Sequence, residues 1–221
     1  GSEMCIRDSC ITYGFMESAD VRASSVMQVA GQMHFTLQLP DGVSQPVALN
    51  MPGRHNVLNA LAAAAIAWQL GVAPAAIAKA MSEFQGVGRR FNIKGDLQLR
   101  NGTALMVDDY GHHPSELSAV FSAARGGWPD KRLVVAFQPH RYSRTRDLFD
   151  EFAAVLSSAD AVVLTDVYAA GEAPILGADS KSLARAIRAR GRIDPIVAGP
   201  AKMLPQVLDD VLKDGDLLLM M

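Results

Sequence analysis

The sequence predicts an α/β protein whose second half is a mostly parallel β-sheet with helices on both faces. From about residue 90 onward, short apolar runs rich in β-branched residues alternate with longer segments of helical periodicity. Strands joined by helices of this length need crossover connections, and such connections place the strands parallel to one another. Two of the apolar runs end in bursts of ionisable residues, at the sheet edge where parallel strands present a ligand site.

The first half of the chain is predicted to form a smaller, mixed region. Short alternating runs over residues 11–50, with a Pro-Asp-Gly turn signal, predict two or three antiparallel strands. An alanine-rich helix is expected over residues 56–70, and Gly71 ends it. A second helix is expected after Pro74, where three apolar residues follow at helical spacing, Ile77, Met81 and Phe84.

A domain boundary is predicted at the Gly-Val-Gly-Arg-Arg stretch, which separates residues 10–86 from residues 87–221. Beyond it, strands are expected at 92–99, 103–109, 132–137, 161–166, 195–198 and 216–221. Helices are expected at 114–125, 144–157, 180–190 and 201–213. We expect strands 103–109 and 132–137 to be adjacent. The pattern indicates a Rossmann-like domain, but no Gly-x-Gly-x-x-Gly follows its first strand, so dinucleotide binding is not supported.

The composition is that of an ordinary globular chain, with 49% hydrophobic and 20% charged residues. A net charge of -2 and a pI near 6.2 argue against non-specific nucleic-acid binding, which needs a basic face. No apolar run reaches the ~20 residues of a membrane span. Both cysteines, Cys5 and Cys10, lie in the first ten residues, which fits a reducing, cytoplasmic location.

The two ends of the chain predict a fragment of a longer protein. Residues 1–9 have no periodicity and no apolar core, so they are interpreted as a non-native leader rather than a signal peptide. Residues 216–221 resemble a core strand, and we expect the domain over 87–221 to be truncated at its end.

Asn56 and Asn59 stand three residues apart at the start of the first predicted helix, so they share one face. An amide offers a donor and an acceptor together, which suits the edge of adenine. The alternative is that Asn56 only caps the helix, because asparagine is a preferred N-cap residue.

The string Asp-Asp-Tyr-Gly-His-His-Pro, at residues 108–114, follows a predicted buried strand. Pro114 and Glu116 are typical of a helix start, so capping accounts for one or two of these polar groups. A loop that brings Asp, Tyr and His together can bind a ribose or a metal-bound nucleotide, and it can take up a proton near neutral pH.

A second string, His-Arg-Tyr-Ser-Arg-Thr at residues 140–145, follows strand 132–137. Arg141 and Arg144 are one turn apart, and paired guanidinium groups can clamp a carboxylate or a phosphate. The alternative is a solvated basic face, but such a face rarely begins directly behind a buried strand.

Two further clusters leave more than one interpretation open. An arginine of the Arg-Arg-Phe string at 89–91 could reach a bound nucleotide, or the two arginines could be an ordinary surface pair. Tyr168, Glu172 and Asp179 lie in a long polar loop that could face a substrate or only connect two elements.

Five of these strings resemble, in order, motifs of the Mur ligases, the ligases of peptidoglycan and cell-wall synthesis. They lie at residues 53–60, 88–91, 108–114, 140–145 and 166–172. The resemblance implies the trailing part of a mixed α/β ATPase domain over 10–86, followed by the amino-acid-binding C-terminal domain. It also implies an ATP-driven reaction, in which a muramate carboxylate forms an acyl phosphate and an amino-acid amine then displaces phosphate to form an amide.

The resemblance further implies UDP-N-acetylmuramate, L-alanine and ATP as substrates, with Mg²⁺ as cofactor. The residues it places at ATP are His55, Asn56, Asn59, Arg90 and Asp109. The residues it places around L-alanine are Tyr110, His112, His140, Arg141 and Arg144, with the arginines on the carboxylate. Those with an implied catalytic role are Arg90, Asp109 and His112.

The sequence departs from the family in lacking its phosphate loop, a glycine-rich stretch ending Gly-Lys-Thr or Gly-Lys-Ser. The uridine-nucleotide domain and the Glu and His that hold magnesium are also missing. We therefore expect no metal ligands in this chain and no ligation by it alone. Two alternatives stay open: a non-catalytic module that holds a small anion or nucleotide, and the related ligase that recycles tripeptide onto muramate.

Overall fold

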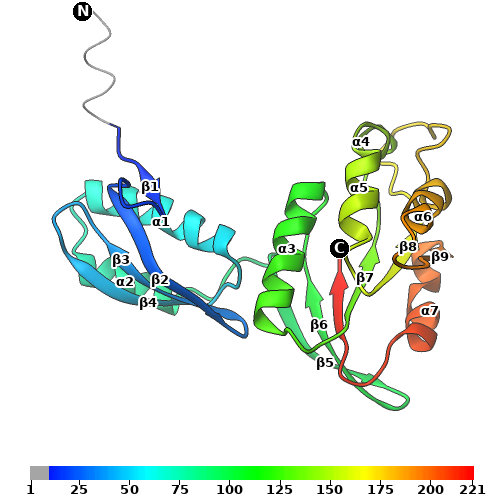
Figure 1. Cartoon of the computed structure of the whole chain (residues 1–221), viewed down its shortest axis with the longest axis horizontal. Helices are drawn as coiled ribbons and strands as arrows, with labels where there is room; N and C mark the ends of the chain where they lie inside the picture. Colours follow the sequence, from blue (N-terminus) through cyan, green and yellow to red (C-terminus); the bar gives the residue numbers. More distant parts are fainter. Residues whose placement is uncertain (1–9) are drawn as a thin grey trace, which may run out of the picture. The chain divides into compact units, whose positions relative to one another are not determined.

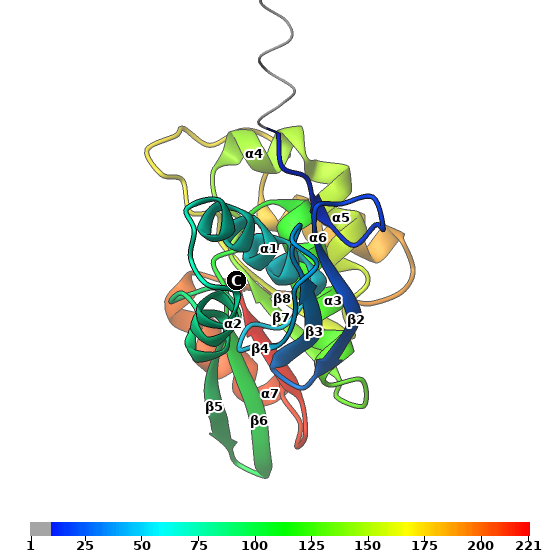
Figure 2. The ribbon, with the colours of Figure 1, turned by 90° about the vertical axis from the view of Figure 1, so that its left-hand side faces the viewer.

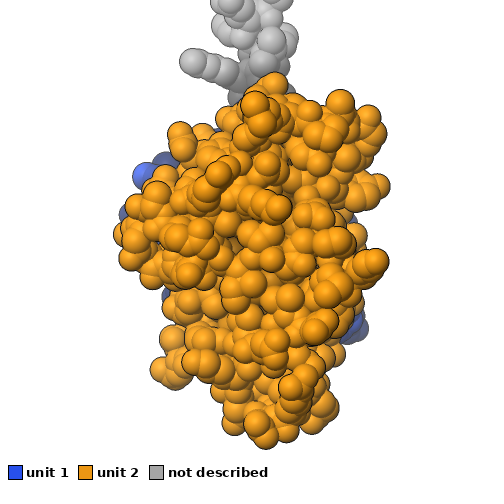
Figure 3. Space-filling view, turned by 90° about the vertical axis from the view of Figure 1, so that its right-hand side faces the viewer, with its two compact units in different colours: residues 1–86 blue, residues 87–221 orange. Residues whose placement is uncertain are grey.

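A computed structural model describes residues 10–221, so the expected non-native leader lies outside the described residues. The chain divides into two compact units, residues 1–86 and residues 87–221 (Figure 3). Each unit has a hydrophobic core of its own.

The first unit is a four-stranded sheet with two helices packed on one face (Figure 2). Its strands, in the order β1-β2-β3-β4, are β1 (Tyr13–Gly14), β2 (Val21–Val29), β3 (Gln32–Gln38) and β4 (Ser44–Leu49). The last three pair antiparallel, as predicted. Side chains alternate along a strand, so Met33, Phe35 and Leu37 of β3 are buried together on the helix-covered face.

The two helices of this unit are α1 (Arg54–Gln69) and α2 (Pro74–Glu83). Helix α1 begins two residues earlier than expected, because Gly53 takes the N-cap position with φ 95°. The prediction that Phe84 continues the apolar face of α2 is wrong. The helix ends at Glu83 and the backbone of Phe84 is extended, so its side chain is exposed while Ile77 and Met81 are buried.

The second unit is a six-stranded sheet in the order β5-β6-β10-β7-β8-β9 (Figure 1). Its strands are β5 (Asn92–Leu99), β6 (Gly102–Asp108), β7 (Leu133–Phe137), β8 (Ala161–Thr165), β9 (Ile196–Gly199) and β10 (Leu217–Met220). Only β5 pairs antiparallel, so the prediction of a mostly parallel sheet is confirmed.

The prediction that strands 103–109 and 132–137 are adjacent is wrong, because β10 lies between β6 and β7 and pairs parallel with both. The residues of β10 are apolar on both faces, and Leu217, Leu218 and Leu219 are all buried. A strand that is apolar on both faces is most stable in the centre of a covered sheet, where both of its faces are buried.

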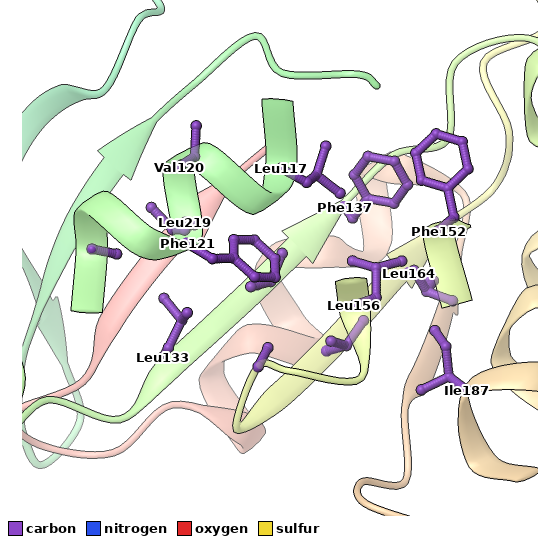
Figure 4. Close-up of a cluster of buried hydrophobic side chains, with 14 of the residues drawn as sticks. Leu117, Val120, Phe121, Leu133, Phe137, Phe152, Leu156, Leu164, Ile187 and Leu219 are labelled. Carbon is purple, nitrogen blue, oxygen red and sulfur yellow. The ribbon is translucent and has the colours of Figure 1, made fainter. Parts of the chain in front are cut away.

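Helices cover both faces of this sheet, as predicted. They are α3 (Pro114–Gly127), α4 (Tyr142–Asp147), α5 (Phe149–Leu156), α6 (Ser180–Ala189) and α7 (Leu204–Val211), with a 3₁₀ turn, η1 (Ala201–Met203), before the last. One face carries α3, α5 and α6, which pack Phe121, Phe152 and Ile187 into the larger core (Figure 4). The opposite face packs against α7 through Leu208.

Two of the predicted helices are interrupted. The helix expected over 144–157 is divided into α4 and α5 at Leu148, whose φ of −115° and ψ of 25° leave the helical region. The helix expected over 201–213 starts as a 3₁₀ turn and becomes α-helical only at Leu204, and Pro205 in its first turn has no amide proton to continue a hydrogen-bond ladder.

Candidate active site

Four parallel strands of the second unit, β6, β10, β7 and β8, end at the same edge of the sheet. In Figure 1 the arrowheads of β10 and β7 point toward the end of the unit where α4 lies. Met221 follows β10 and contacts the loop after β7. Its oxygen accepts from the amide of Gln138 at 2.8 Å. Gly111 lies close to the Met221 side chain, since an added Cβ would lie 2.7 Å from the Met221 Cε and would push it aside. The loops after β6 and β7 therefore both pack closely on the end of β10, the strand between them.

Asp109 is buried beneath this edge, and both its carboxylate oxygens accept backbone hydrogen bonds. Oδ1 accepts from Gly111 N–H and Oδ2 from Phe91 N–H, each at 2.7 Å. The Phe91 bond fixes a segment in which Arg89 and Phe91 both have positive φ, at 59° and 45°. Non-glycine residues rarely adopt this conformation, and such strain concentrates at functional sites. Arg90 is held between the two strained residues.

Glu116 links Arg90 to the Asp-His loop. Its Oε2 accepts from the amides of His112 and His113, at 2.9 and 3.1 Å, and its Oε1 lies 3.5 Å from Arg90 Nη1. Burial alone would raise the pKa of Glu116, but these amides and the charges of His112 and Arg90 hold it below its usual value. His113 itself is the N-cap of α3 and forms a capping box with Glu116.

Tyr110 and His112 pack against each other in the loop after β6. The Arg89 guanidinium stacks 4.7 Å from the centre of the Tyr110 ring, and that ring meets His112 edge-on at 5.2 Å. His112 Nδ1 lies 3.0 Å from the carbonyl oxygen of Tyr110. A carbonyl can only accept, so Nδ1 carries the proton and Nε2 of a neutral His112 keeps its lone pair.

His140, after β7, and Arg144, in α4, lie beside His112. The ring centres of His112 and His140 are 6.0 Å apart. Arg144 Nη1 donates to the carbonyl oxygen of His140 at 3.2 Å and lies 3.3 Å from its Nδ1. Burial, and then the charges of Arg144, His112 and Arg141, lower the pKa of His140. Nδ1 accepts in this contact, because a guanidinium can only donate, and the contact therefore favours the neutral ring.

Arg141 differs from Arg144 in its surroundings. Its side chain is half exposed, and its Nη1 lies 3.9 Å from Glu172 Oε1 in the loop after β8. The same loop places the Tyr168 ring 5.1 Å from the ring of His140. Asp179, at the far end of the loop, accepts from Ser182 N–H and is the N-cap of α6, so its side chain has a structural role.

The predicted ATP residues of the first unit lie in the first two turns of α1. Asn56 is buried and donates through Nδ2 to the carbonyl oxygen of Pro52 at 2.7 Å. It lies inside the helix and donates, so it is not the N-cap. Asn59 shares the face, as predicted, and its Nδ2 lies 3.5 Å from Asn56 Oδ1. His55 is half-buried and Asn59 is exposed.

Residues 10–221 contain no candidate metal centre and no candidate membrane span. No group of three or more His, Cys, Asp or Glu side chains in this part of the chain is arranged to hold a metal ion. None of its helices is both long enough and apolar enough to cross a bilayer.

Comparison with known families decides the relationship. Residues 89–221 match the family described as Mur ligase, glutamate ligase domain, and residues 5–67 match the Mur ligase middle domain. The chain belongs to the Mur ligase family. The expectation of this family is therefore confirmed.

Named relatives narrow the similarity within the Mur ligases. The chain is 68% identical over 212 residues to the UDP-N-acetylmuramate–L-alanine ligases of Xanthomonas oryzae pv. oryzae and Stenotrophomonas maltophilia. Those matches cover 96% of this chain but 44% of each relative, so the chain spans less than half their length. A crystal structure of the Thermotoga maritima UDP-N-acetylmuramate–alanine ligase superimposes with a TM-score of 0.74 at 26% identity, covering 95% of this chain and 43% of that one.

Within this Mur ligase domain, the structure brings together several of the residues predicted from sequence. Tyr110, His112, His140 and Arg144 form a continuous series of ring and hydrogen-bond contacts. Sequence reasoning missed the connection of Glu116 to Arg90, although a Glu three residues after a helix cap is a recognisable signal. It also missed the contact between Glu172 and Ser143, which no local pattern reveals because the two are 29 residues apart.

Proposed function

We propose that this chain contributes the amino-acid site of a UDP-N-acetylmuramate–L-alanine ligase, a cytoplasmic enzyme of peptidoglycan synthesis. The relatives that are 68% identical carry that name, and they support L-alanine over the tripeptide of the recycling ligase. In the proposed reaction, ATP activates the muramate carboxylate as an acyl phosphate, and the amine of L-alanine then displaces phosphate.

The observation that carries this proposal is the environment of the Arg144 side chain. Its guanidinium is partly buried, is held by His140, and forms no ion pair with a carboxylate of the described residues. A partly buried cation without a counter-ion favours an anionic ligand, and a guanidinium matches a carboxylate in a two-pronged contact. The α-carboxylate of L-alanine is such a ligand.

His112 is the proposed base for the alanine amine. An α-ammonium group must lose a proton before its nitrogen can attack, and the Nε2 lone pair of His112 can take that proton. The carbonyl oxygen of Tyr110 fixes the tautomer at 3.0 Å, and Glu116 Oε2, 3.8 Å from Nδ1, would stabilise the resulting imidazolium. The carbonyl group therefore orients the ring, and the carboxylate provides the opposite charge.

Arg90 and Asn59 are the residues that we propose to contact ATP. Arg90 is half exposed at 49% and can reach a phosphate, while Asn59 is exposed on α1. Asp109 and Asn56 are buried and engaged with backbone groups of their own units, so we assign each of them a structural role. The described residues offer no group of ligands that would fit Mg²⁺.

The test is a chimera in which this chain replaces the matching 44% of the Xanthomonas oryzae ligase. A charge-assisted carboxylate contact is worth roughly 1.5–3 kcal/mol, so Arg144→Ala should raise the alanine KM about 10- to 150-fold. The KM for ATP should stay nearly unchanged. Arg144→Lys should recover part of the loss, because an ammonium cannot make the paired contact. An unaltered alanine KM in Arg144→Ala would end the assignment.

A further inference from the structure

Helix α4, which carries Arg144, begins without a cap of its own. Its N-cap residue is Arg141, whose side chain has no acceptor and whose backbone has a positive φ of 74°. A helix start is normally stabilised by an N-cap side chain that accepts from the amide of the second or third helical residue. The amide of Ser143, the second residue of α4, needs an acceptor from elsewhere.

Glu172 supplies that acceptor from the loop after β8. Its Oε2 accepts from Ser143 N–H at 2.9 Å, and its Oε1 accepts from the Ser143 hydroxyl at 2.6 Å. The side chain is 24% exposed, and its Oε1 also lies 3.9 Å from Arg141 Nη1. One carboxylate thus contacts both the N-cap residue and the first turn of α4.

The backbone conformation of the loop after β8 places Glu172 at this position. Ala170 and Gly171 have positive φ, at 50° and 86°, and the Glu172 amide closes the turn by donating to Ala169 O at 3.0 Å. Farther back, the Arg141 amide donates to Tyr168 O at 2.8 Å, which aligns the loop with the start of α4. Ala170 lacks the freedom of glycine, so the conformation has a cost that the contacts of Glu172 offset.

We propose that Glu172 is a positioning residue for the amino-acid site: it fixes the first turn of α4, and through that turn it aims Arg144 at the substrate carboxylate. This inference rests on the proposed function. It also separates the two arginines, because Arg141 is paired with Glu172 whereas Arg144 has no carboxylate partner among the described residues.

Removing Glu172 has two opposing effects on an anionic ligand. Loss of a negative charge would strengthen the attraction of the site for a carboxylate, whereas loss of the cap would free the turn that holds Arg144. A carboxylate in contact with water and already paired with Arg141 acts weakly on a second charge, while a missing cap typically costs a helix about 2- to 30-fold in stability. The positioning effect should therefore dominate.

The experiment measures binding of L-alanine and of L-alaninamide, which lacks the carboxylate, to the ¹⁵N-labelled 221-residue chain by NMR titration. The chain itself should prefer L-alanine. Glu172→Ala should lower that preference roughly 10-fold. Glu172→Gln should keep most of it, because the amide oxygen can accept from Ser143 N–H while the amide nitrogen donates to the hydroxyl. Adding Ser143→Ala to Glu172→Ala should weaken the preference little further, since both act on one contact.

The matched control is Glu151→Ala, which removes an exposed carboxylate of α5 that makes no hydrogen bond or ion pair with the described residues. A general loss of structure would lower the affinity for both ligands equally, so the ratio isolates the positioning role. Equal or stronger L-alanine preference in Glu172→Ala would overturn this inference alone. No preference in the unaltered chain would overturn the proposed function, and the inference with it.

Discussion

Asp108 and Asp109 are adjacent in the sequence, but their carboxylates make different contacts. Asp109 is buried and satisfies two backbone amides, whereas Asp108 lies 3.9 Å from Arg89 and 3.8 Å from Lys94 near the surface. We expect Asp109→Ala to destabilise the second unit by about 2–3 kcal/mol, because it leaves buried donors unpaired. Asp108→Ala should cost less than about 1 kcal/mol.

Urea unfolding measures this difference when it is followed by the fluorescence of Trp128, which stacks on Phe91 at 5.8 Å. A Trp68→Phe background leaves Trp128 as the single tryptophan, since the chain has two. Equal losses for the two aspartates would show that the Phe91 and Gly111 amides do not depend on Asp109.

His140 should titrate below its ordinary pKa of 6.5. Burial and the neighbouring Arg144, His112 and Arg141 charges disfavour its protonated form. A depressed pKa in the folded state means that this group favours folding fully above pH 6.5, and that the contribution is lost as the pH falls through the folded value. NMR of the imidazole should show the low midpoint.

Arg144→Ala is the diagnostic variant for this titration, because it removes the largest of the three charge effects. The midpoint of His140 should then move up toward 6.5. A His140 midpoint insensitive to Arg144 would contradict the contact between the Arg144 guanidinium and the His140 ring.

At the scale of elements, the turn between β5 and β6 is restricted by one glycine. Gly102 has φ 107°, and a Cβ there would overlap the side chain of Asp214, whose Oδ1 accepts from Thr103 N–H at 2.8 Å. Gly102→Ala should therefore cost about 1–2 kcal/mol for the backbone and roughly 1–2 kcal/mol more for the displaced carboxylate.

Gly171→Ala is the control for Gly102→Ala. Gly171 also has a positive φ, at 86°, but open space surrounds the position of its missing Cβ. Its substitution should show only the backbone cost of about 1–2 kcal/mol in the same unfolding assay. Identical values for the two glycines would mean that the Asp214 contact contributes nothing to the turn.

The elements also show what sequence can and cannot predict. Runs such as Leu133–Phe137 are apolar on both faces, so they could be recognised as buried parallel strands. The place of β10 between β6 and β7 could not, because strand order depends on pairing between residues far apart in the chain. The polar residues at the strand ends could be predicted because they directly follow such apolar runs in the sequence. The Glu172 contact could not, because it depends on a loop conformation that no periodicity encodes.

At the scale of the whole chain, we expect amino-acid binding to be separable from ligation. The contacts proposed for the alanine carboxylate and amine lie within residues 87–221, while no Gly-Lys-Ser or Gly-Lys-Thr string occurs in the chain. Such a loop holds the phosphates of ATP in enzymes that use it, and phosphoryl transfer depends almost wholly on positioning and charge. We therefore expect this chain to bind the amino acid without catalysing ligation.

We expect the purified 221-residue chain to bind L-alanine yet to form no amide from ATP, UDP-N-acetylmuramate and L-alanine with Mg²⁺. Loss of phosphate positioning removes a contribution of many decades in rate, so phosphate release should equal the protein-free background. The chimera with the Xanthomonas oryzae ligase, assayed beside it, should release phosphate only when L-alanine is present. Amide formation by the chain alone, sensitive to Arg144→Ala, would instead mean that these residues complete a ligase without the phosphate loop.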